Sequence, residues 1–498
     1  MCRSNRAPAR RAIPPRPVPL ALRWRRLAFT GLAACALALA GAGCAREPFR
    51  PRHVFLVTVD TLRADHLGSY GYGRATSPRL DAAATDGVLF EQAIVQWPKT
   101  GPSFASMFTG QYPQTTGLTH EAALRVPEAY LTLPELFREL GFTTVAVVSN
   151  HVLDDELGWD AGFEEYLETW RGEEGVSHDP VVYRKGINAV RVNELALPLL
   201  ARHRDATRLF AWIHYSDPHA PYILPDGYEN PFLGDRFYVG DDIVEIESPR
   251  ATALGERRDR KFYVAQYDAN VHLADLHIGE LLEHLDRLGL LEGSLVVFTA
   301  DHGESLGEHG YCCGHGRLPY NQSARVPLIF YAPGHLPAAV RVALPVELVD
   351  LYPTLLDLVA PGREVAGLEG TTLGPLLAAG PPAPEVAAQF RWAFSEAGGG
   401  SPLTHFRSVQ GPTWKLVYHP ARKVKRQARP ILYELYDLEA DPGETRDVKE
   451  AHPEVWRELR GVLFEWMKGS EWIRRPRGFV EEHSEEMKKA LKALGYLP

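Results

Sequence analysis

One hydroxyl side chain stands where a helix is expected to begin. The stretch from Trp97 to Pro113 reads W-P-K-T-G-P-S-F-A-S-M-F-T-G-Q-Y-P. Pro102 suits the first turn of a helix, and Gly110 suits its end. We therefore expect Thr100 at the electropositive end of a short helix, where unpaired backbone N–H groups favour an anion such as phosphate or sulfate. A hydroxyl alone is a weak nucleophile, so Thr100 needs a metal ion or a base to activate it.

Candidate metal ligands follow two apolar runs that are far apart in the sequence. The run H-V-F-L-V-T-V leads into Asp60, and the run L-V-V-F-T-A leads into Asp301 and His302. Such runs are typical of buried parallel strands, and open α/β sheets bind ligands beyond the carboxyl ends of their strands. We expect these three side chains to meet Thr100 and to hold one divalent cation, which lowers the pKa of a hydroxyl that it touches. The alternative is that the carboxylates and Thr100 only cap helices.

Five motifs occur in order along the chain: V-T-V-D-T-L-R-A-D at 57–65, T-G-P-S-F-A-S-M-F-T-G at 100–110, D-P-H-A-P-Y at 217–222, D-H-G-E-S-L-G-E-H-G at 301–310 and L-Y-D-L-E-A-D-P-G-E-T at 435–445. Together they resemble the sulfatase family of the alkaline phosphatase superfamily, from about Arg52 to the C-terminus. The resemblance implies an α/β fold, an alkaline phosphatase-like doubly wound mixed sheet flanked by helices, with a smaller C-terminal α+β subdomain. It also implies that the metal ligands are Asp60, Thr100, Asp301 and His302, with Thr100 as the nucleophile.

The chain departs from the family at the nucleophile. Sulfatases of the main type carry C-x-P-S-R, in which the Cys or Ser is oxidised to formylglycine. This chain has Thr100 at that position and Phe104 in place of the Arg. A formylglycine hydrate expels sulfate by collapsing to an aldehyde, whereas a sulfated Thr has no such route. A phosphorylated Thr can be attacked at phosphorus, so the sequence favours phosphoryl chemistry.

The metal ligands depart from the family as well. The first strand of the family often ends in two acidic ligands, whereas Asp60 is followed here by Thr61. Oxygen-rich sites favour Ca²⁺ or Mg²⁺, and exchanging a carboxylate for the imidazole of His302 shifts the preference towards Mn²⁺ or Zn²⁺. We therefore expect one divalent metal ion and leave Mn, Zn, Ca and Mg all open.

Histidines in three motifs are further candidates. His219 resembles the family histidine that contacts the ester and assists the leaving group as a general acid. His315, in C-C-G-H-G, lies near the position of a family lysine that binds the anion. His151 falls where the family has another histidine, but Ser149 replaces a family lysine nearby. Each histidine could instead be structural, and we predict only His219 and His315 as catalytic residues beside Thr100.

Alternating patterns predict the elements that position these residues. The expected strands of the large sheet are 53–59, 88–95, 143–148, 209–214, 294–300 and 326–331. The expected helices are 76–87, 133–140, 261–288 and 350–359. The stretch 223–257 is predicted to be a long loop that shapes access to the site. Strands within 406–418 and 431–438, with helices at 456–467 and 481–494, are expected to form the smaller domain.

The beginning of the chain has the composition of an export signal. Residues 1–26 are rich in Arg and Pro without an acid, residues 27–43 are uncharged, and Cys44 follows L-A-G-A-G. This pattern indicates a signal peptide whose apolar region is short for a membrane span. Cys44 fits the lipidated position of bacterial lipoproteins, and an ordinary secretory signal is the alternative. We expect an exported protein of the bacterial cell envelope, either lipid-anchored to the membrane through Cys44 or periplasmic.

The predicted domains follow from these boundaries. They are a signal peptide (1–43), a tether (44–52), a catalytic domain (53–360), a linker (361–384) and a C-terminal subdomain (385–498).

Charge and cysteine content limit the partners and the covalent links. Residues 1–43 carry eight Arg and no acid, so their removal changes the net charge from −9 to −17. Nucleic acid is therefore not an expected partner. After the leader and Cys44, only the adjacent Cys312 and Cys313 remain, so no disulfide framework is predicted. This pair lacks the spacing of ordinary zinc sites.

Three functions remain open at this point. The favoured one is a sulfatase-family, metal-dependent hydrolase or transferase that uses Thr100 to attack a phosphate, phosphonate or sulfate ester. The first alternative is a sulfatase, a sulfuric ester hydrolase, whose nucleophile is metal-bound water. The second is an inactive, lipid-anchored binding protein that retains the metal. The expected partner is an anionic ester, with a cell-surface glycan or a lipid headgroup as candidates.

Overall fold

The computed structural model describes residues 49–119, 128–171, 187–238, 258–398, 405–420 and 431–469, positions 126 and 254, and the short strands at 422–424 and 427–429. The expected leader (1–43), Cys44, most of the loop 239–257 and the expected helix 481–494 lie outside the described residues. The chain from Arg50 onward forms one compact unit. Among the described residues, no helix is both long enough and apolar enough to cross a membrane.

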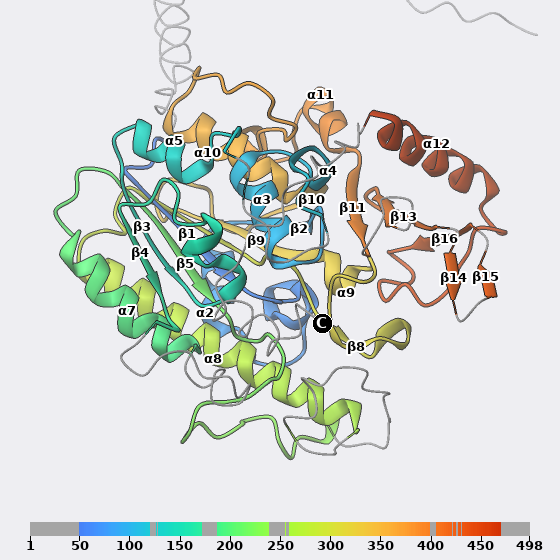
Figure 1. The fold of residues 1–498 in the computed structure, drawn as a ribbon, viewed down its shortest axis with the longest axis horizontal. Helices are drawn as coiled ribbons and strands as arrows, with labels where there is room; N and C mark the ends of the chain where they lie inside the picture. Colours follow the sequence, from blue (N-terminus) through green and yellow to red (C-terminus); the bar gives the residue numbers. More distant parts are fainter. Residues whose placement is uncertain are drawn as a thin grey trace, which may run out of the picture. The chain divides into compact units, whose positions relative to one another are not determined.

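An eight-stranded mixed sheet forms the centre of the molecule (Figure 1). Its strands, in spatial order, are β10 (Val340–Glu347), β2 (Val88–Ile94), β9 (Arg325–Tyr331), β6 (Ser294–Thr299), β1 (His53–Val59), β5 (Leu209–Tyr215), β3 (Thr143–Val148) and β4 (Glu165–Glu168). β9 runs antiparallel to both of its neighbours, and the other pairings are parallel. The carboxyl ends of β6, β1, β5 and β3 therefore lie along one edge of the sheet.

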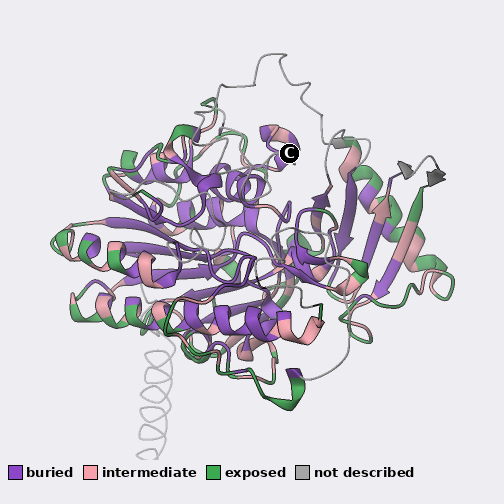
Figure 2. Ribbon diagram, turned by 60° about the horizontal axis from the view of Figure 1, so that its bottom comes forward, coloured by how far each residue is buried: buried purple, intermediate pink, exposed green. Residues whose placement is uncertain are grey.

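Helices cover both faces of this sheet (Figure 1). On one face lie α2 (Pro78–Thr85), α7 (Ala189–Arg202) and α8 (Arg260–Arg287), and on the other lie α3 (Thr100–Thr109), α5 (Leu133–Glu139) and α10 (Leu351–Val359). Strands between two helical layers are buried on both sides, which is why their sequences are continuous apolar runs. Figure 2 shows the buried strands at the centre, and every residue of β1, β5 and β6 is buried.

A smaller antiparallel sheet follows the large one in the sequence. It contains β11 (Ala393–Ala397), β12 (Phe406–Gln410), β13 (Trp414–His419) and β16 (Leu432–Asp437). The helix α12 (Pro453–Gly469) packs on it through Leu459 and Leu463, which meet Leu416 and Leu435. Two hairpins complete the description, β7 (Ser305–Leu306) with β8 (Cys312–Gly314) and β14 (Arg422–Val424) with β15 (Gln427–Arg429).

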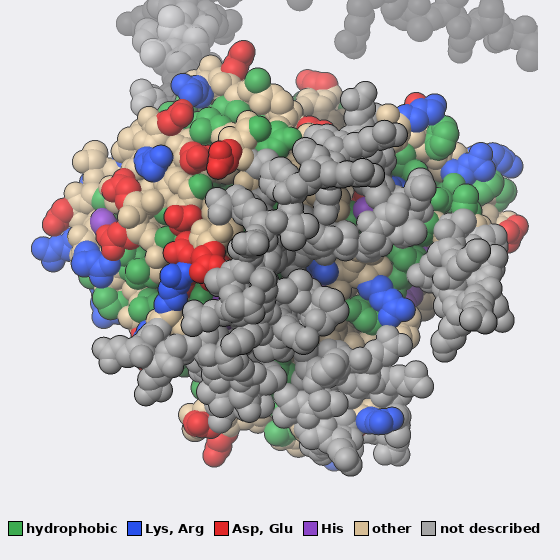
Figure 3. Space-filling view, in the orientation of Figure 1, with side chains coloured by type: hydrophobic (Ala, Val, Ile, Leu, Met, Phe, Trp, Pro, Cys, Tyr) green, Lys and Arg blue, Asp and Glu red, His purple; other side chains and the backbone are tan. Residues whose placement is uncertain are grey.

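The predicted fold class is confirmed, with a mixed helix-flanked sheet and a small C-terminal antiparallel sheet. The strands predicted at 53–59 and 143–148 have the predicted bounds, and α8 lies within one residue of its prediction. α7, β4, β10 and β11 were not predicted from the sequence. The predicted domain boundaries stay a prediction. On the face seen in Figure 3, acidic and basic side chains are interspersed.

Candidate metal centre and active site

Two neighbouring parallel strands bring the candidate carboxylates together. β1 and β6 pair in register up to Thr58 and Thr299, so Asp60 and Asp301 follow at the same edge of the sheet. Each of Asp60, Asp301 and His302 offers a ligand atom within 4.8 Å of the others, and all three are fully buried. The Nε2 atom of His302 lies 3.4 Å from Oδ2 of Asp301 and 3.8 Å from Oδ1 of Asp60.

Thr100 joins this cluster from the first position of α3. Its Oγ1 atom lies 3.3 Å from Nε2 of His302, and its side chain is buried. The first turn of a helix leaves backbone N–H groups without helical partners, and the helix dipole adds partial positive charge there. Gly110 ends α3 in the left-handed conformation, as its position in the motif predicts. The four predicted ligands therefore lie together, and Thr100 stands at a helix end that favours anions.

Backbone groups orient the two ligands from the D-H-G motif. The backbone N–H groups of His302 and Thr61 donate to Oδ1 of Asp301, at 2.9 and 3.2 Å. The Nδ1 atom of His302 lies 2.9 Å from the carbonyl oxygen of Gly303, and only a protonated Nδ1 can donate there. The lone pair of the neutral ring is then on Nε2, which faces the two carboxylates and Thr100.

The donor set fits one divalent cation. It consists of two carboxylates, one imidazole nitrogen and one hydroxyl, a combination that suits Zn²⁺ or Mn²⁺ and is compatible with harder cations. Burial raises the pKa of Asp301 to about 7, because an ionised carboxylate is costly where water cannot reach it. A cation at this position would offset that burial and keep both carboxylates ionised.

Asn150 contacts Asp60, and this contact was not predicted from the sequence. Its Nδ2 donates to Oδ2 of Asp60 at 2.6 Å, and its Oδ1 accepts the backbone N–H of Val152 at 3.0 Å. These two bonds fix the amide orientation and leave Oδ1 of Asp60 on the side of His302. The position of Asn150 could have indicated this role, because it follows the predicted strand 143–148 at the edge of the sheet where the other ligands lie.

Aromatic groups occupy the place of the family arginine. Phe104 is fully buried, and its ring lies edge-on to His214, with centroids 5.1 Å apart. Oγ1 of Thr58 accepts from Nε1 of Trp212 at 2.9 Å and lies 3.0 Å from Nδ1 of His214. The Nε2 atom of His214 faces Oδ2 of Asp60 at 4.0 Å. Phe104 and His214 therefore form an aromatic wall beside Asp60.

Thr61 does not replace the missing second carboxylate through its side chain. Its Oγ1 donates to the carbonyl oxygen of Asp60 at 2.7 Å, and its φ of 58° is in the left-handed region. The carbonyl oxygen of Thr61 accepts from the hydroxyl of Tyr267 at 2.7 Å. Thr61 therefore contributes through its backbone, which holds the turn after β1 against Asp301.

Both predicted catalytic histidines lie beside the cluster. The rings of His302 and His315 have centroids 4.1 Å apart, and those of His315 and His219 are 5.1 Å apart. Nδ1 of His219 lies 2.6 Å from the carbonyl oxygen of Ala220, and Nδ1 of His315 lies 3.3 Å from Oε1 of Glu304. The three imidazoles form a row, and the fully buried Glu304 orients its middle member. Glu304 was not among the site residues predicted from the sequence.

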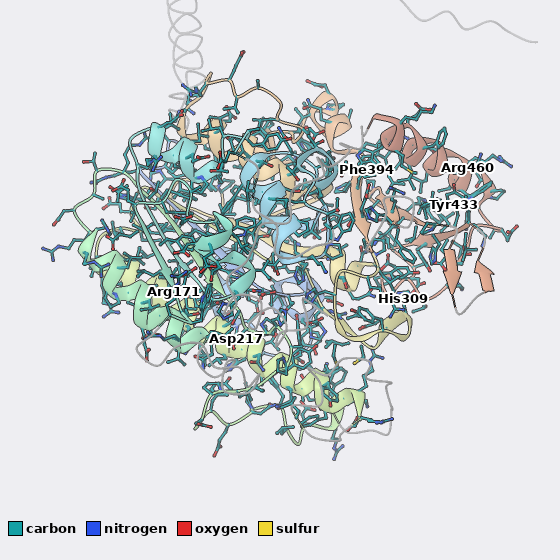
Figure 4. The ribbon with its side chains drawn as sticks, viewed as in Figure 1. Arg171, Asp217, His309, Phe394, Tyr433 and Arg460 are labelled. Atoms are coloured by element: carbon teal, nitrogen blue, oxygen red, sulfur yellow. The ribbon has the colours of Figure 1, made fainter. Side chains whose placement is uncertain are left out.

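His151 contacts an aromatic ring and a second group of carboxylates. Its ring packs on Trp170, with centroids 4.4 Å apart, and its Nδ1 lies 4.0 Å from Asp154. A second carboxylate cluster stands there, made of Asp154, Asp155 and Glu168. The guanidinium of Arg171, labelled in Figure 4, makes ion pairs with all three of its members. That cluster already has its cation, so we assign no metal to it.

Comparisons with known proteins show the family of this chain. Residues 52–361 match the model of the sulfatase family, and residues 307–468 match the model of the C-terminal part of N-sulphoglucosamine sulphohydrolase. The chain is 29% identical to iduronate 2-sulfatase of Mus musculus, over 69% of this chain and 75% of that protein. It is 24% identical to N-acetylglucosamine-6-O-sulfatase of Bacteroides thetaiotaomicron, over 86% and 89%.

Solved structures with a similar fold include enzymes of two chemistries. A 2-O GAG sulfatase is 21% identical with a TM-score of 0.66, covering 88% of this chain and 99% of that chain. The phosphonate monoester hydrolase of Agrobacterium radiobacter is 21% identical with a TM-score of 0.63, covering 84% and 95%. Because the family model covers more than half of the sequence, this chain belongs to the sulfatase family of ester hydrolases.

Proposed function

We propose that this hydrolase cleaves phosphate or phosphonate esters, with the hydroxyl of Thr100 as the attacking group. One observation carries the proposal: Oγ1 of Thr100 lies 3.3 Å from Nε2 of His302, at the start of α3 and beside two buried carboxylates. Asp60, Asp301, His302 and Thr100 would hold the divalent metal that enzymes of this family generally use. Such a metal supplies positive charge that lowers the pKa of a hydroxyl beside it.

The identity of the nucleophile favours phosphorus over sulfur. By its motif, Thr100 corresponds to the residue that is oxidised in formylglycine-dependent sulfatases, and a sulfated Thr cannot release sulfate by collapsing to an aldehyde. A phosphorylated Thr is resolved instead when water or an acceptor alcohol attacks phosphorus, and the Thr oxygen then leaves. Sulfatases and phosphonate monoester hydrolases have similar folds, so the fold does not decide between phosphorus and sulfur esters. We therefore base this choice on the nucleophile.

The row of histidines could assist the departure of the leaving alcohol. The leaving alcohol needs a proton as its bond to phosphorus breaks, and an imidazole in contact with the ester can donate it. We assign this role to His219, whose Nδ1 is turned to the carbonyl of Ala220 and whose ring faces His315. His315, oriented by Glu304, would bind an oxygen of the ester anion.

The first test is a panel of aryl esters on the purified, metal-loaded protein. It compares an aryl phosphate, a phosphodiester, a phosphonate monoester and a sulfate. The proposal expects turnover of at least one phosphorus ester, with loss of that turnover in Thr100→Ala. Turnover of the sulfate alone, at a rate that survives Thr100→Ala, would overturn it.

The second candidate is a sulfatase that acts without formylglycine and uses water as its nucleophile. The relatives favour it, because the curated proteins of 24 to 29% identity reported above are named as sulfatases. One similar structure holds D-glucosamine-2-N,6-O-disulfate, and another holds a neocarrahexaose. A sulfated glycan is therefore the alternative substrate class. Metal binding without turnover of any ester would instead indicate a binding protein.

We also propose that the protein is exported and anchored through Cys44, as its leader composition predicts. Labelling of producing cells with a palmitate analogue should mark the wild-type protein and leave Cys44→Ala unmarked. Equal labelling of the two would exclude the anchor.

A further inference from the structure

The hairpin of β7 and β8 carries two adjacent thiols in direct contact. The Sγ atoms of Cys312 and Cys313 lie 2.8 Å apart, and both side chains are buried, at 3% and 1% exposure. The sulfur atoms in a disulfide are about 2.05 Å apart, so a small movement would bring these two to bonding distance. In the sequence, this pair leaves no disulfide framework to hold the fold, and its spacing does not suit a zinc site.

The backbone at this pair is already in an uncommon conformation. Cys313 has a φ of 58°, in the left-handed region that few residues other than Gly adopt. Adjacent Cα atoms are about 3.8 Å apart, which is closer than in most disulfides. A bond between these thiols would therefore be strained, and strained disulfides are readily reduced and act as labile or regulatory bonds.

The same hairpin leads directly into the candidate active site. His315 follows Cys313 by two residues, and its ring packs on His302 with centroids 4.1 Å apart. Its Nδ1 lies 3.3 Å from Glu304, and its carbonyl accepts from the hydroxyl of Tyr311 at 3.2 Å. A rotation of the backbone at Cys313 would therefore be transmitted to His315 through a short and tightly held segment.

We propose that Cys312 and Cys313 form a reversible disulfide between adjacent residues, and that its closure moves His315 away from Glu304 and lowers turnover. The oxidant is a disulfide reagent of the glutathione class. The Cys312 thiolate attacks one sulfur of the reagent and releases one thiol. The Cys313 sulfur then attacks the mixed disulfide and releases the second thiol, and the two protons of the pair leave with these products.

Exchange in the folded protein should be slow. The hydrogen bond with the Cys312 thiol and burial both raise the pKa of the Cys313 thiol. Little thiolate is then present at neutral pH, and the thiolate is the reactive form. The incubations that test the proposal therefore run overnight.

The experiment equilibrates the full-length, metal-loaded protein with oxidised or reduced glutathione. Each sample is denatured in excess N-ethylmaleimide and digested with trypsin. The mass of the peptide Leu288–Arg317 is then measured. We expect no maleimide and a loss of two hydrogen atoms after oxidation, and two maleimides after reduction. Two maleimides on this peptide in both samples would overturn the proposal. This readout is independent of the proposed function.

Turnover of an aryl ester, which rests on the proposed function, tests the link to His315. Oxidised protein should turn over about threefold more slowly or worse, since a displacement near 1 Å can slow a reaction by up to about 10²-fold. Reduced glutathione should restore the rate. Cys312→Ser and Cys313→Ser cannot close the bond, so each should be insensitive to oxidant. Equal rates for the oxidised and reduced wild-type protein would contradict the link.

Discussion

Asp60 contacts an amide and faces an imidazole in addition to His302. Asn150 donates to its Oδ2 at 2.6 Å, His214 faces the same oxygen at 4.0 Å, and the ring of Phe104 closes the site behind His214. A cation bound at this site would compensate the charge of the two buried carboxylates. The position of Asp60 then depends on Asn150, which acts on the metal through a hydrogen bond to a ligand.

Replacing Asn150 by Ala should weaken metal binding. The loss of a hydrogen bond that orients a ligand typically lowers metal affinity about 10–100-fold. Calorimetric titration of the metal-free protein with Mn²⁺ and separately with Zn²⁺ measures this. Gln389→Ala, an exposed amide in the small domain, is the matched control and should bind as the wild type does. Unchanged affinity of Asn150→Ala for both metals would remove Asn150 from the site.

Site residues could be predicted where the local sequence pattern fixes their position. Asp60, Thr100, Asp301 and His302 follow strands or begin a helix, and the structure brings them within reach of one another. Asn150 and Glu304 were missed because their importance comes from partners distant in sequence or from orientation. The effect of Phe104 was also hidden, since its contact with His214 exists only after β5 packs on α3.

At the scale of elements, the junction of β10 with the 3₁₀ turn η8 (Leu348–Asp350) holds two buried carboxyl groups. Glu347 accepts from the hydroxyl of Tyr112 at 2.8 Å and from the backbone N–H of Phe394 at 3.0 Å. Burial and the charge of Asp350 raise the pKa of Glu347 to about 8. The folded protein therefore binds a proton here more tightly than the unfolded chain does, so stability is lost as pH rises through about 8.

Glu347→Gln should remove this pH dependence, because the amide stays neutral and keeps its oxygen as an acceptor. We expect little change in melting temperature at pH 5 and a gain at pH 9. A gain of about 1 kcal/mol corresponds to roughly 2–4 °C in domains of 150–250 residues. Scanning calorimetry of both proteins at the two pH values measures the difference. A variant that is less stable by the same amount at both would contradict the raised pKa.

Elements with continuous apolar patterns were predictable, and two of the elements that were missed, α7 and β10, contain a proline. β1 and β3 are unbroken apolar runs between two helical layers, so their bounds could be read directly. α7 contains Pro198, and β10 contains Pro345 beside a register shift at the edge of the sheet. Proline weakens a helical pattern and confines a strand to edges and bulges, so both elements lack a clear sequence signal.

At the scale of the molecule, a buried ion pair beside the small sheet is linked to the large domain through Asn321. Nζ of Lys415, on β13, lies 2.8 Å from Oε1 of Glu444, and both side chains are 1% exposed. Lys415 also donates to Oδ1 of Asn321 at 2.8 Å, and the backbone N–H of Asn321 donates to Glu444 at 2.6 Å. Asn321 begins the short helix α9 (Asn321–Ala324), which leads into β9.

Glu444→Ala should destabilise the whole chain. It leaves the ammonium group of Lys415 buried without its carboxylate, a change that typically costs about 3–5 kcal/mol. Urea unfolding followed by tryptophan fluorescence measures the free energy of unfolding. Glu450→Ala, an exposed glutamate six residues further on, is the control and should change it by less than about 0.5 kcal/mol. Equal stability of the two variants would show that this ion pair does not stabilise the protein.

The central claim is that Thr100 attacks the ester, and the kcat/KM of Thr100→Ala on an aryl phosphate ester tests it most directly. The protein is loaded with metal, and calorimetry verifies that the variant still binds it. The account predicts a loss of about 10³-fold or more, as expected when a nucleophile is removed, with Thr100→Ser retaining most of the activity. A Thr100→Ala variant that binds metal and keeps its rate within about tenfold of the wild type would contradict the account.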